Sequence, residues 1–125
     1  MVWGRSSNWA AAGEKGLPIS VQMTLKGVPS LKKIVEAFSK TVFLLDHLGR
    51  VTLEDGPPYS AAGPLLELAP YPNVHLKFTS RMVEQCHTGD ASAETFMPFS
   101  LEHFGAERIM WGSTFRRMTI RWRIF

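Results

Sequence analysis

TVFLLDHLGR, at residues 41–50, runs from apolar and β-branched residues directly into a carboxylate, Asp46, and an imidazole, His47. An apolar run of this length between Lys40 and Gly49 predicts a strand buried on both faces, as in parallel sheets covered by helices. The carboxyl ends of parallel strands are where ligands bind, because the loops there converge over the sheet. His47 is therefore the first candidate for a functional side chain.

The composition fits one domain. The chain has 125 residues, of which 45% are hydrophobic, which is enough for one core and too few for two ordinary domains. Residues 1–115 carry ten Lys or Arg against eleven Asp or Glu, and residues 116–125 carry four arginines and no acid. The net charge of +3 thus comes from the end of the chain, which argues against a nucleic-acid-binding face on the domain. We expect a domain at 1–115 and a divergent basic and apolar tail at 116–125.

The cysteine content and the hydropathy predict a compartment. The single cysteine, Cys86, excludes a disulfide within the chain and fits a reducing environment. No stretch approaches the ~20 apolar residues of a membrane span, and the first residues lack the apolar segment of a signal peptide. We therefore expect a cytoplasmic protein.

Periodicity predicts four units of strand and helix. Alternation of apolar and polar residues, or an apolar run between turn formers, predicts strands at 18–24, 41–46, 73–80 and 107–113. Helical periodicity or composition predicts helices at 8–16, 29–40, 64–69 and 93–104. Ser30 is the expected N-cap of the second helix, and residues 81–92 are expected to form a long loop. The strands recur every ~25–35 residues, which predicts parallel pairing through helical crossovers.

The end of the chain breaks this pattern. Ile120, Trp122 and Ile124 alternate with arginines, which suits either an added edge strand or an unstructured end. A weaker alternative gives this tail a role in binding acidic surfaces such as nucleic acid or lipid.

Three stretches resemble successive signatures of the amidohydrolase-related (amidohydrolase 2) family. They are DHLGR at 46–50, YPNVHLKFTS at 71–80 and FGAERIMWGS at 104–113, in the order and spacing of that family. The family comprises TIM-barrel hydrolases and decarboxylases and includes lactonases. The resemblance implies an α/β fold, namely the C-terminal half of a (β/α)8 TIM barrel with about four parallel strands and flanking helices.

The same resemblance implies that parts of the family site are absent. The family's His-x-His pair has no counterpart here, and Gln22 stands where some members have a metal-binding histidine. Thr114 stands where an aspartate usually follows the Trp-Gly-Ser motif, and its hydroxyl cannot replace a carboxylate as base or cation ligand. We interpret this departure as a truncation or a change of reading frame. A divalent, zinc-like metal is implied for the full-length family, but we predict no metal ligand in this chain.

His47 is the predicted catalytic residue. Its family position implies an imidazole that hydrogen-bonds a hydrolytic water or a substrate carbonyl, and the alternative is a buried histidine bonded to a backbone carbonyl. Asp46 faces the other way by strand alternation and is expected to cap or brace the following loop. His87 and His103 are expected to lie in a loop and on the surface, without a metal.

Gln22, Lys77 and Thr79 are the predicted substrate-binding residues. Lys77 and Thr79 share a strand face with His75. If that face is the barrel lumen, Lys77 needs a carboxylate or water, so a structural salt bridge is its alternative role. Gln22 is either a site amide or a lumen filler.

The expected function is hydrolysis of a lactone, an ester-like substrate or an amide by activated water, in a truncated chain that can be inactive. The alternative is a non-catalytic half-barrel that self-associates or binds a partner chain. Half a barrel leaves two open strand edges and an exposed lumen face, lined by residues such as Leu45, His75 and Met110. The expected partners are a small-molecule substrate and a second copy of the chain, with neither nucleic acid nor membrane.

Overall fold

The computed structural model describes residues 6–112 and 120–123. Its sheet has the strand order β4-β3-β2-β1-β5, and every neighbouring pair is parallel. The strands are β1 (Ile19–Gln22), β2 (Phe43–Asp46), β3 (Val74–Phe78), β4 (Ile109–Trp111) and β5 (Ile120–Arg123). The α-helices are α1 (Ser6–Glu14), α2 (Val28–Ala37), α3 (Gly63–Leu66), α4 (Ser80–Gln85) and α5 (Ala93–Phe104).

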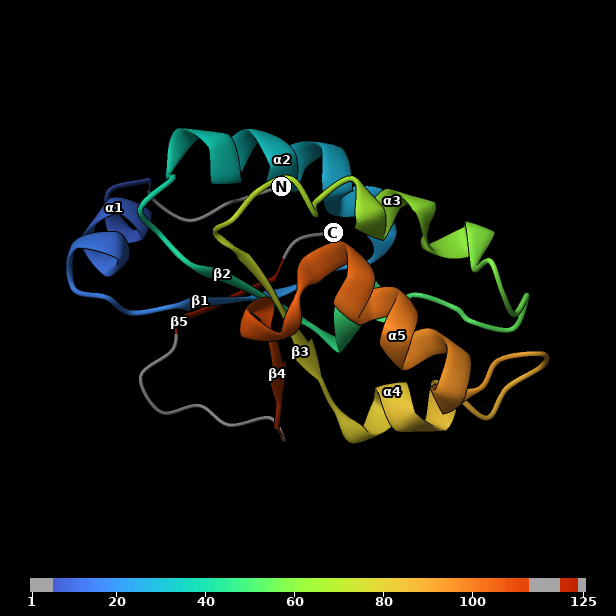
Figure 1. Cartoon of the computed structure of the whole chain (residues 1–125). Coiled ribbons are helices and arrows are strands. Elements are labelled where there is room, and N and C mark those ends of the chain that lie inside the picture. The colour runs from blue at the N-terminus through green and yellow to red at the C-terminus, as the bar shows by residue number, and fades with distance from the viewer. Residues whose placement is uncertain (1–5, 113–119, 124–125) are drawn as a thin grey trace.

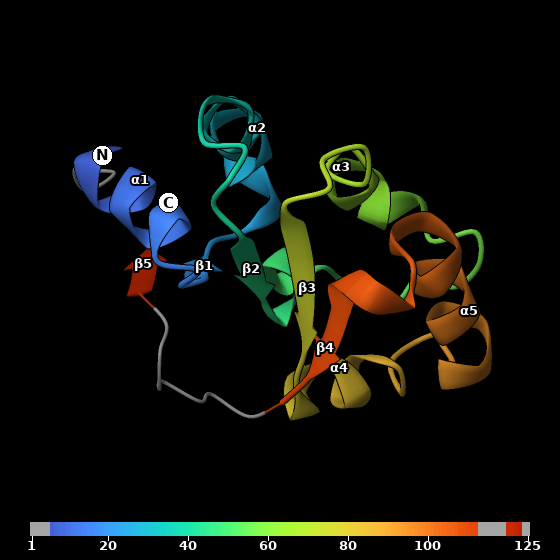
Figure 2. The same ribbon diagram turned by 60° about the vertical axis from the view of Figure 1, so that its left-hand side comes forward.

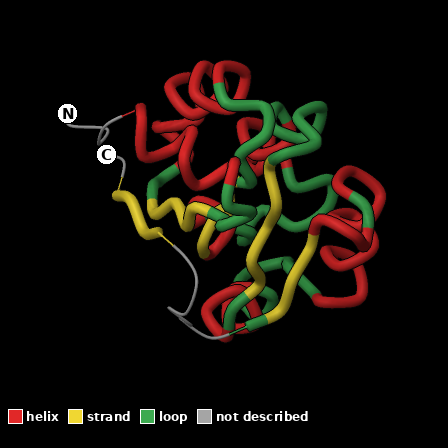
Figure 3. The backbone as a smooth tube through the Cα atoms, turned by 90° about the vertical axis from the view of Figure 1, so that its left-hand side faces the viewer, coloured by secondary structure: helices red, strands yellow, loops and turns green. Residues whose placement is uncertain are grey.

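The chain alternates between strand and helix so that β1 to β4 lie side by side in chain order. Helices α1, α2, α3 and α5 follow one another along the row of strands in Figures 1 and 2. In the tube of Figure 3 most of the helices lie above and to the right of the strands, and one strand lies at the left margin of the molecule. The predicted fold, four parallel strands with flanking helices as in half of a (β/α)8 barrel, is confirmed. None of the helices within residues 6–112 is long and apolar enough to cross a bilayer.

The two faces of the sheet differ in chemistry. One face is apolar and packs against the helices: it comprises Ile19, Val21, Phe43, Leu45, Val74, Leu76 and Phe78, all at most 2% exposed. The opposite face, which we call the inner face, comprises Ser20, Gln22, Leu44, Asp46, His75, Lys77 and Met110. Burying one large aliphatic or aromatic side chain contributes about 1.5–3 kcal/mol, so the burial of this apolar face is a major source of stability.

The register corrects one expectation about the lumen. Leu45 pairs with Val21 and Leu76 and lies in the apolar core at 1% exposure, so its assignment to the lumen face was wrong. His75 does lie on the inner face and is half-buried, and Met110 is 45% exposed there. Successive residues of a strand point to opposite faces of the sheet. A shift of one residue in the assignment of a strand therefore exchanges its buried and inner-face residues.

Two local features differ from the sequence prediction. Helix α2 begins at Val28 with Gly27 as its N-cap, so Ser30 is not the cap, because Pro29 already occupies the first turn, where its missing N–H is tolerated. Residues 80–85 form helix α4 instead of a loop. This helix buries only Met82 fully, with Cys86 just beyond its end, and two anchors are too few to produce a visible helical period.

Two polar side chains fasten the amino-terminal end of the sheet. Asn73 Nδ2 donates to the carbonyl oxygens of Val35, Phe38 and Thr41, at 3.1, 3.2 and 3.1 Å, and so joins the end of α2 to the start of β2. Arg108 donates from Nε and both terminal nitrogens to four backbone carbonyls, those of Phe104, Tyr71, Val74 and Ala69. These bonds satisfy carbonyl groups that helix and strand ends leave without intrahelical or ladder partners.

The tail contributes β5 to the sheet. Residues 120–123 pair in parallel with β1 over four positions, from Ile19↔Ile120 to Gln22↔Arg123. The sequence suited either an added edge strand or an unstructured end, and these four residues form the edge strand. Thr114, residues 116–119 and residues 124–125 lie outside the described residues.

Candidate active site

The predicted site residues gather at the carboxyl ends of β1, β2 and β3. Gln22 is the last residue of β1, His47 follows β2 directly, and Thr79 follows β3. Because β2 lies between β1 and β3 in a parallel sheet, these three strand ends meet at one rim. We call this set the rim site: Gln22, Asp46, His47, Lys77 and Thr79.

The chain turns in a left-handed conformation immediately after β2. The φ angle is 54° at His47, 51° at Leu48, 66° at Gly49 and 56° at Arg50. For a residue other than glycine this conformation costs about 1–2 kcal/mol, because Cβ crowds the following carbonyl oxygen. A Cβ on Gly49 would also lie 2.8 Å from Leu25 Cδ2, so a side chain at this position would require the Leu25 side chain to shift. Leu48 is completely buried and fixes the turn, and strain of this kind is typical of functional sites.

The turn brings His47 to Thr79. His47 Nδ1 lies 2.6 Å from Thr79 Oγ1, across 32 residues of sequence. Thr79 is 4% exposed and His47 is half-buried. The bond occupies one ring nitrogen and fixes the ring plane, which leaves Nε2 for a water or a substrate carbonyl. The sequence alternative in which His47 bonds a backbone carbonyl does not match this geometry.

Electrostatics favour a neutral His47. Burial lowers its pKa below the ordinary value of 6.5, and the Asp46 carboxylate opposes this effect. Arg81, Arg50 and Lys77 lower the pKa further, because positive charges disfavour imidazolium. A neutral imidazole is the form that can accept a proton at neutral pH.

Asp46 and Lys77 are register partners on the inner face and form an ion pair. Asp46 Oδ1 lies 3.9 Å from Lys77 Nζ, and their side chains are 1% and 9% exposed. Asp46 was expected to cap or brace the following loop, and the capping alternative was wrong, since its side chain makes no capping bond there. The physical reason is that the carboxylate points along the sheet toward the ammonium group of the next strand. Lys77 thus has the carboxylate partner that its burial requires.

Gln22 stands at the same rim, half-buried at the end of β1. Its role as substrate-binding residue remains a prediction, as do those of Lys77 and Thr79. Sequence reasoning missed Arg50 and Arg81, whose charges act on His47. Arg50 lies three residues after His47, so its closeness in sequence could have indicated its effect on the imidazole. Arg81 lies at the start of α4, a helix that the sequence did not predict.

The remaining histidines lie away from the rim. His75 is near the amino-terminal end of β3 and lines a cavity of about 660 Å³ together with Phe104 and Arg108. Burial and Arg108 lower the pKa of His75. His87 and His103 are exposed, as expected.

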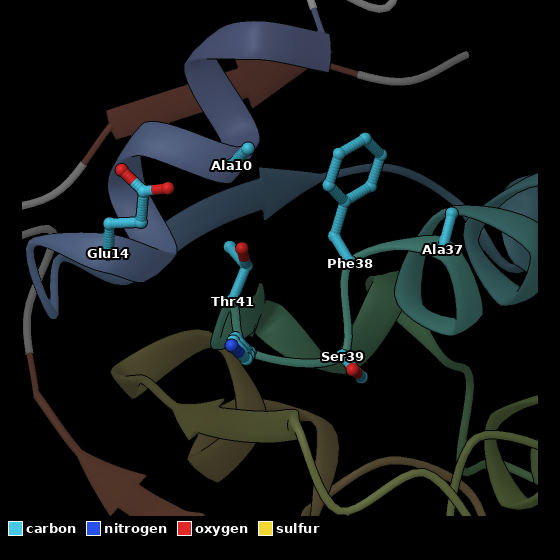
Figure 4. Close-up of a pocket in the computed structure, with 7 residues that line it drawn as sticks. Ala10, Glu14, Ala37, Phe38, Ser39 and Thr41 are labelled. Atoms are coloured by element: carbon cyan, nitrogen blue, oxygen red, sulfur yellow. The ribbon is translucent and has the colours of Figure 1, made fainter.

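A second cavity, of about 290 Å³, lies between α1 and the end of α2 (Figure 4). Its lining includes Ala10, Glu14, Phe38 and Thr41, and it is placed at the amino-terminal side of β2. Neither this cavity nor the one at His75 is lined by a residue of the rim site.

The donor set does not fit a metal ion. Among the described residues, no three His, Cys, Asp or Glu side chains converge as a metal-binding group. Within the rim site His47 already bonds Thr79 through Nδ1, and Asp46 faces Lys77. A zinc site requires three or four protein ligands, so these residues alone do not form one.

The chain is similar in sequence and in structure to known amidohydrolases. A family model for amidohydrolases matches residues 2–115. The chain is 26% identical over 98 residues to the L-fucono-1,5-lactonase of Burkholderia ambifaria, a match that covers 78% of this chain and 34% of the lactonase. It is similar to the structure of an amidohydrolase from Burkholderia multivorans with bound zinc, at a TM-score of 0.63 and 21% identity, covering 86% of this chain and 41% of that one. It is also similar to amidohydrolase 2 from Bifidobacterium longum subsp. infantis, at a TM-score of 0.59 and 18% identity, covering 93% and 43%.

The chain therefore spans about a third of the lactonase and about two fifths of each of these solved structures. The structural matches agree with the half-barrel described above. On the family match over residues 2–115, this chain belongs to the amidohydrolase family.

Proposed function

We propose that the rim site is part of the active site of a lactone hydrolase, with His47 as its catalytic base. The observation that carries the proposal is the His47–Thr79 bond of 2.6 Å, made by a left-handed turn at the carboxyl end of a parallel strand. The similarity to a fuconolactonase supports a lactone as the substrate class, with ester-like and amide substrates as related alternatives.

The chemistry follows from the neutral imidazole. With Nδ1–H donating to Thr79 Oγ1, Nε2 accepts a proton from a water that attacks the lactone carbonyl carbon. The acyl C–O bond then breaks, and the proton returns to the departing alkoxide oxygen. The product is a hydroxy acid, and no step requires a change in oxidation state.

The surrounding cations suit this reaction. Arg50, Arg81 and Lys77 lie close enough to His47 to lower its pKa. Negative charge develops on the carbonyl oxygen during attack and remains on the carboxylate of the product. Positive groups at the rim stabilise that charge, which is a large contribution to catalysis in sites of this kind.

The test is hydrolysis of a panel of sugar and dicarboxylate lactones by the purified chain, with and without added zinc. We expect His47→Ala to lower kcat/KM by about 10²–10⁴, the contribution of a positioned general base. His87→Ala replaces an exposed histidine and is the matched control, with an unchanged rate expected. Hydrolysis that is equally fast in the His47 variant would contradict the assignment.

A second candidate function is a non-catalytic half-barrel that binds another chain. It is favoured by β4, where Met110 is 45% and Trp111 is 69% exposed. Absence of hydrolysis across the panel, with a folded chain, would favour this candidate over the first.

A further inference from the structure

The row of strands from β1 to β4 has two edges, and only one of them is paired with a further strand. β1 is covered on its outer edge by β5, whereas none of the described strands lies beyond β4. Gly112 N–H donates to the Phe78 carbonyl at 3.0 Å, so the backbone of Gly112 faces β3. Because successive residues of a strand face opposite neighbours, the N–H groups of Ile109 and Trp111 face outward. This edge is apolar in sequence and includes the large exposed side chain of Trp111.

The two edges are complementary. All strands are parallel, so β4 of one molecule can extend the sheet of another at the outer edge of β1 with the correct polarity. The pairing of β5 demonstrates that this edge accepts a parallel strand over four positions. Two molecules joined in this way at both edges contribute β1 to β4 each, which closes the ring and leaves no open edge.

The sequence of β5 differs from that of β4 in a way that fits a protective role. β5 reads Ile-Arg-Trp-Arg, whereas β4 reads Ile-Met-Trp. Charged residues on an edge strand discourage further strand addition, and β4 has none.

We propose that β5 is an exchangeable edge strand that occupies the position of β4 from a second copy of this chain. Displacement of β5 opens the edge of β1, and two copies then pair β4 to β1 reciprocally. This inference gives the second candidate function a specific partner and geometry. It does not depend on hydrolysis, so the lactone assay and the association experiment can fail separately.

The first test compares the full chain with Arg121→Pro/Trp122→Pro by size-exclusion chromatography with light scattering. One of two adjacent residues directs its N–H at β1, and proline removes that donor. We expect the unmodified chain at low concentration to have the mass of one chain, and the double variant to have the mass of two. Adding Trp111→Pro, which removes an outward-facing donor of β4, should return the mass to that of one chain. A double variant that stays monomeric with an unchanged circular dichroism spectrum would overturn the proposal.

A second measurement uses only the unmodified chain, in case the proline variants do not fold. Hydrogen exchange is followed while the concentration is raised to the solubility limit. We expect the amides of residues 120–123 to lose protection as that of Trp111 gains it, with a parallel rise in mass. Association with β5 fully protected, or no association at any concentration, contradicts strand exchange.

Discussion

His47 combines three properties that few side chains have together. It occupies a left-handed backbone conformation, it bonds a buried threonine hydroxyl at 2.6 Å, and burial and nearby cations lower its pKa. The first property fixes where the ring lies, the second fixes its plane, and the third favours its neutral form. For the proposed base, these properties would hold a neutral imidazole in place before substrate arrives, which reduces the reorganisation that catalysis requires.

The lowered pKa values of His47 and His75 predict how stability depends on pH. The unfolded chain binds protons at these histidines more readily than the folded chain does. Their contribution to stability is therefore present above the ordinary value of 6.5 and is lost as the pH falls through the folded pKa values. Urea unfolding between about pH 5 and 8 should show a loss of stability on the acid side that is smaller in His47→Gln/His75→Gln. An unchanged pH dependence in this variant would contradict the assignment.

The buried pair Asp46–Lys77 predicts a coupled effect on stability. Asp46→Leu leaves the Lys77 ammonium without this carboxylate, and breaking a buried pair costs about 3 kcal/mol. Lys77→Met should also destabilise the fold, whereas Asp46→Leu/Lys77→Met should recover most of the loss, because no charge then remains buried. Denaturant unfolding of the three variants measures the coupling. Strictly additive losses would show that the two side chains do not interact.

The turn at residues 47–50 and helix α4 are the elements that build the rim. The turn carries His47 and Arg50, and α4 begins directly after Thr79 and carries Arg81. Both elements are short and poorly suited to their local sequence, since one is left-handed at non-glycine residues and the other lacks a side-chain N-cap bond. Contacts with β2 and β3, rather than intrinsic conformational propensity, therefore hold the turn and α4 in place.

The strain in the turn can be tested with glycine. Arg50 is exposed and has φ = 56°, so Arg50→Gly should stabilise the chain by up to about 1 kcal/mol, because the Cβ clash disappears. Arg81→Gly is the matched control: it removes the same side chain from a right-handed helix and should destabilise by about 0.5–1 kcal/mol. Thermal unfolding distinguishes the two. Destabilisation in both variants would mean that the turn at Arg50 is not strained.

The two ends of the sheet differ in their polar interactions, and the proposed active site lies at only one of them. The amino-terminal end of the sheet is held by Asn73 and Arg108, which together satisfy seven backbone carbonyls. The carboxyl end carries the strained turn, the ion pair and His47. This division is the one that parallel β/α barrels generally have, with stability at one end and chemistry at the other. Among the described strands none lies beyond β4, whereas a closed barrel has no free strand edge.

Two tryptophans differ in burial, and substituting each of them tests this difference. Trp9 is 5% exposed and packs edge-on against Phe38, whereas Trp111 is 69% exposed at the open edge. Trp9→Ala should therefore cost about 3–5 kcal/mol, and Trp111→Ala should change the free energy of unfolding of the monomer by no more than about 0.5 kcal/mol. Urea unfolding at low concentration measures both. A large loss in the Trp111 variant would mean that this side chain is buried in the monomer.

The amino-acid sequence was sufficient for the identity and chain order of β1 to β4, for three of the longer helical segments and for the place of His47 at the end of β2. These features follow from periodicity and from an apolar run that stops at a polar residue, both of which are local. The tertiary structure was needed for the His47–Thr79 bond, the pairing of Asp46 with Lys77, the core position of Leu45, helix α4 and the addition of β5 to β1. Each of these depends on strand register or on contacts between residues far apart in the chain, and a local pattern of hydrophobicity does not specify which distant residue becomes the neighbour.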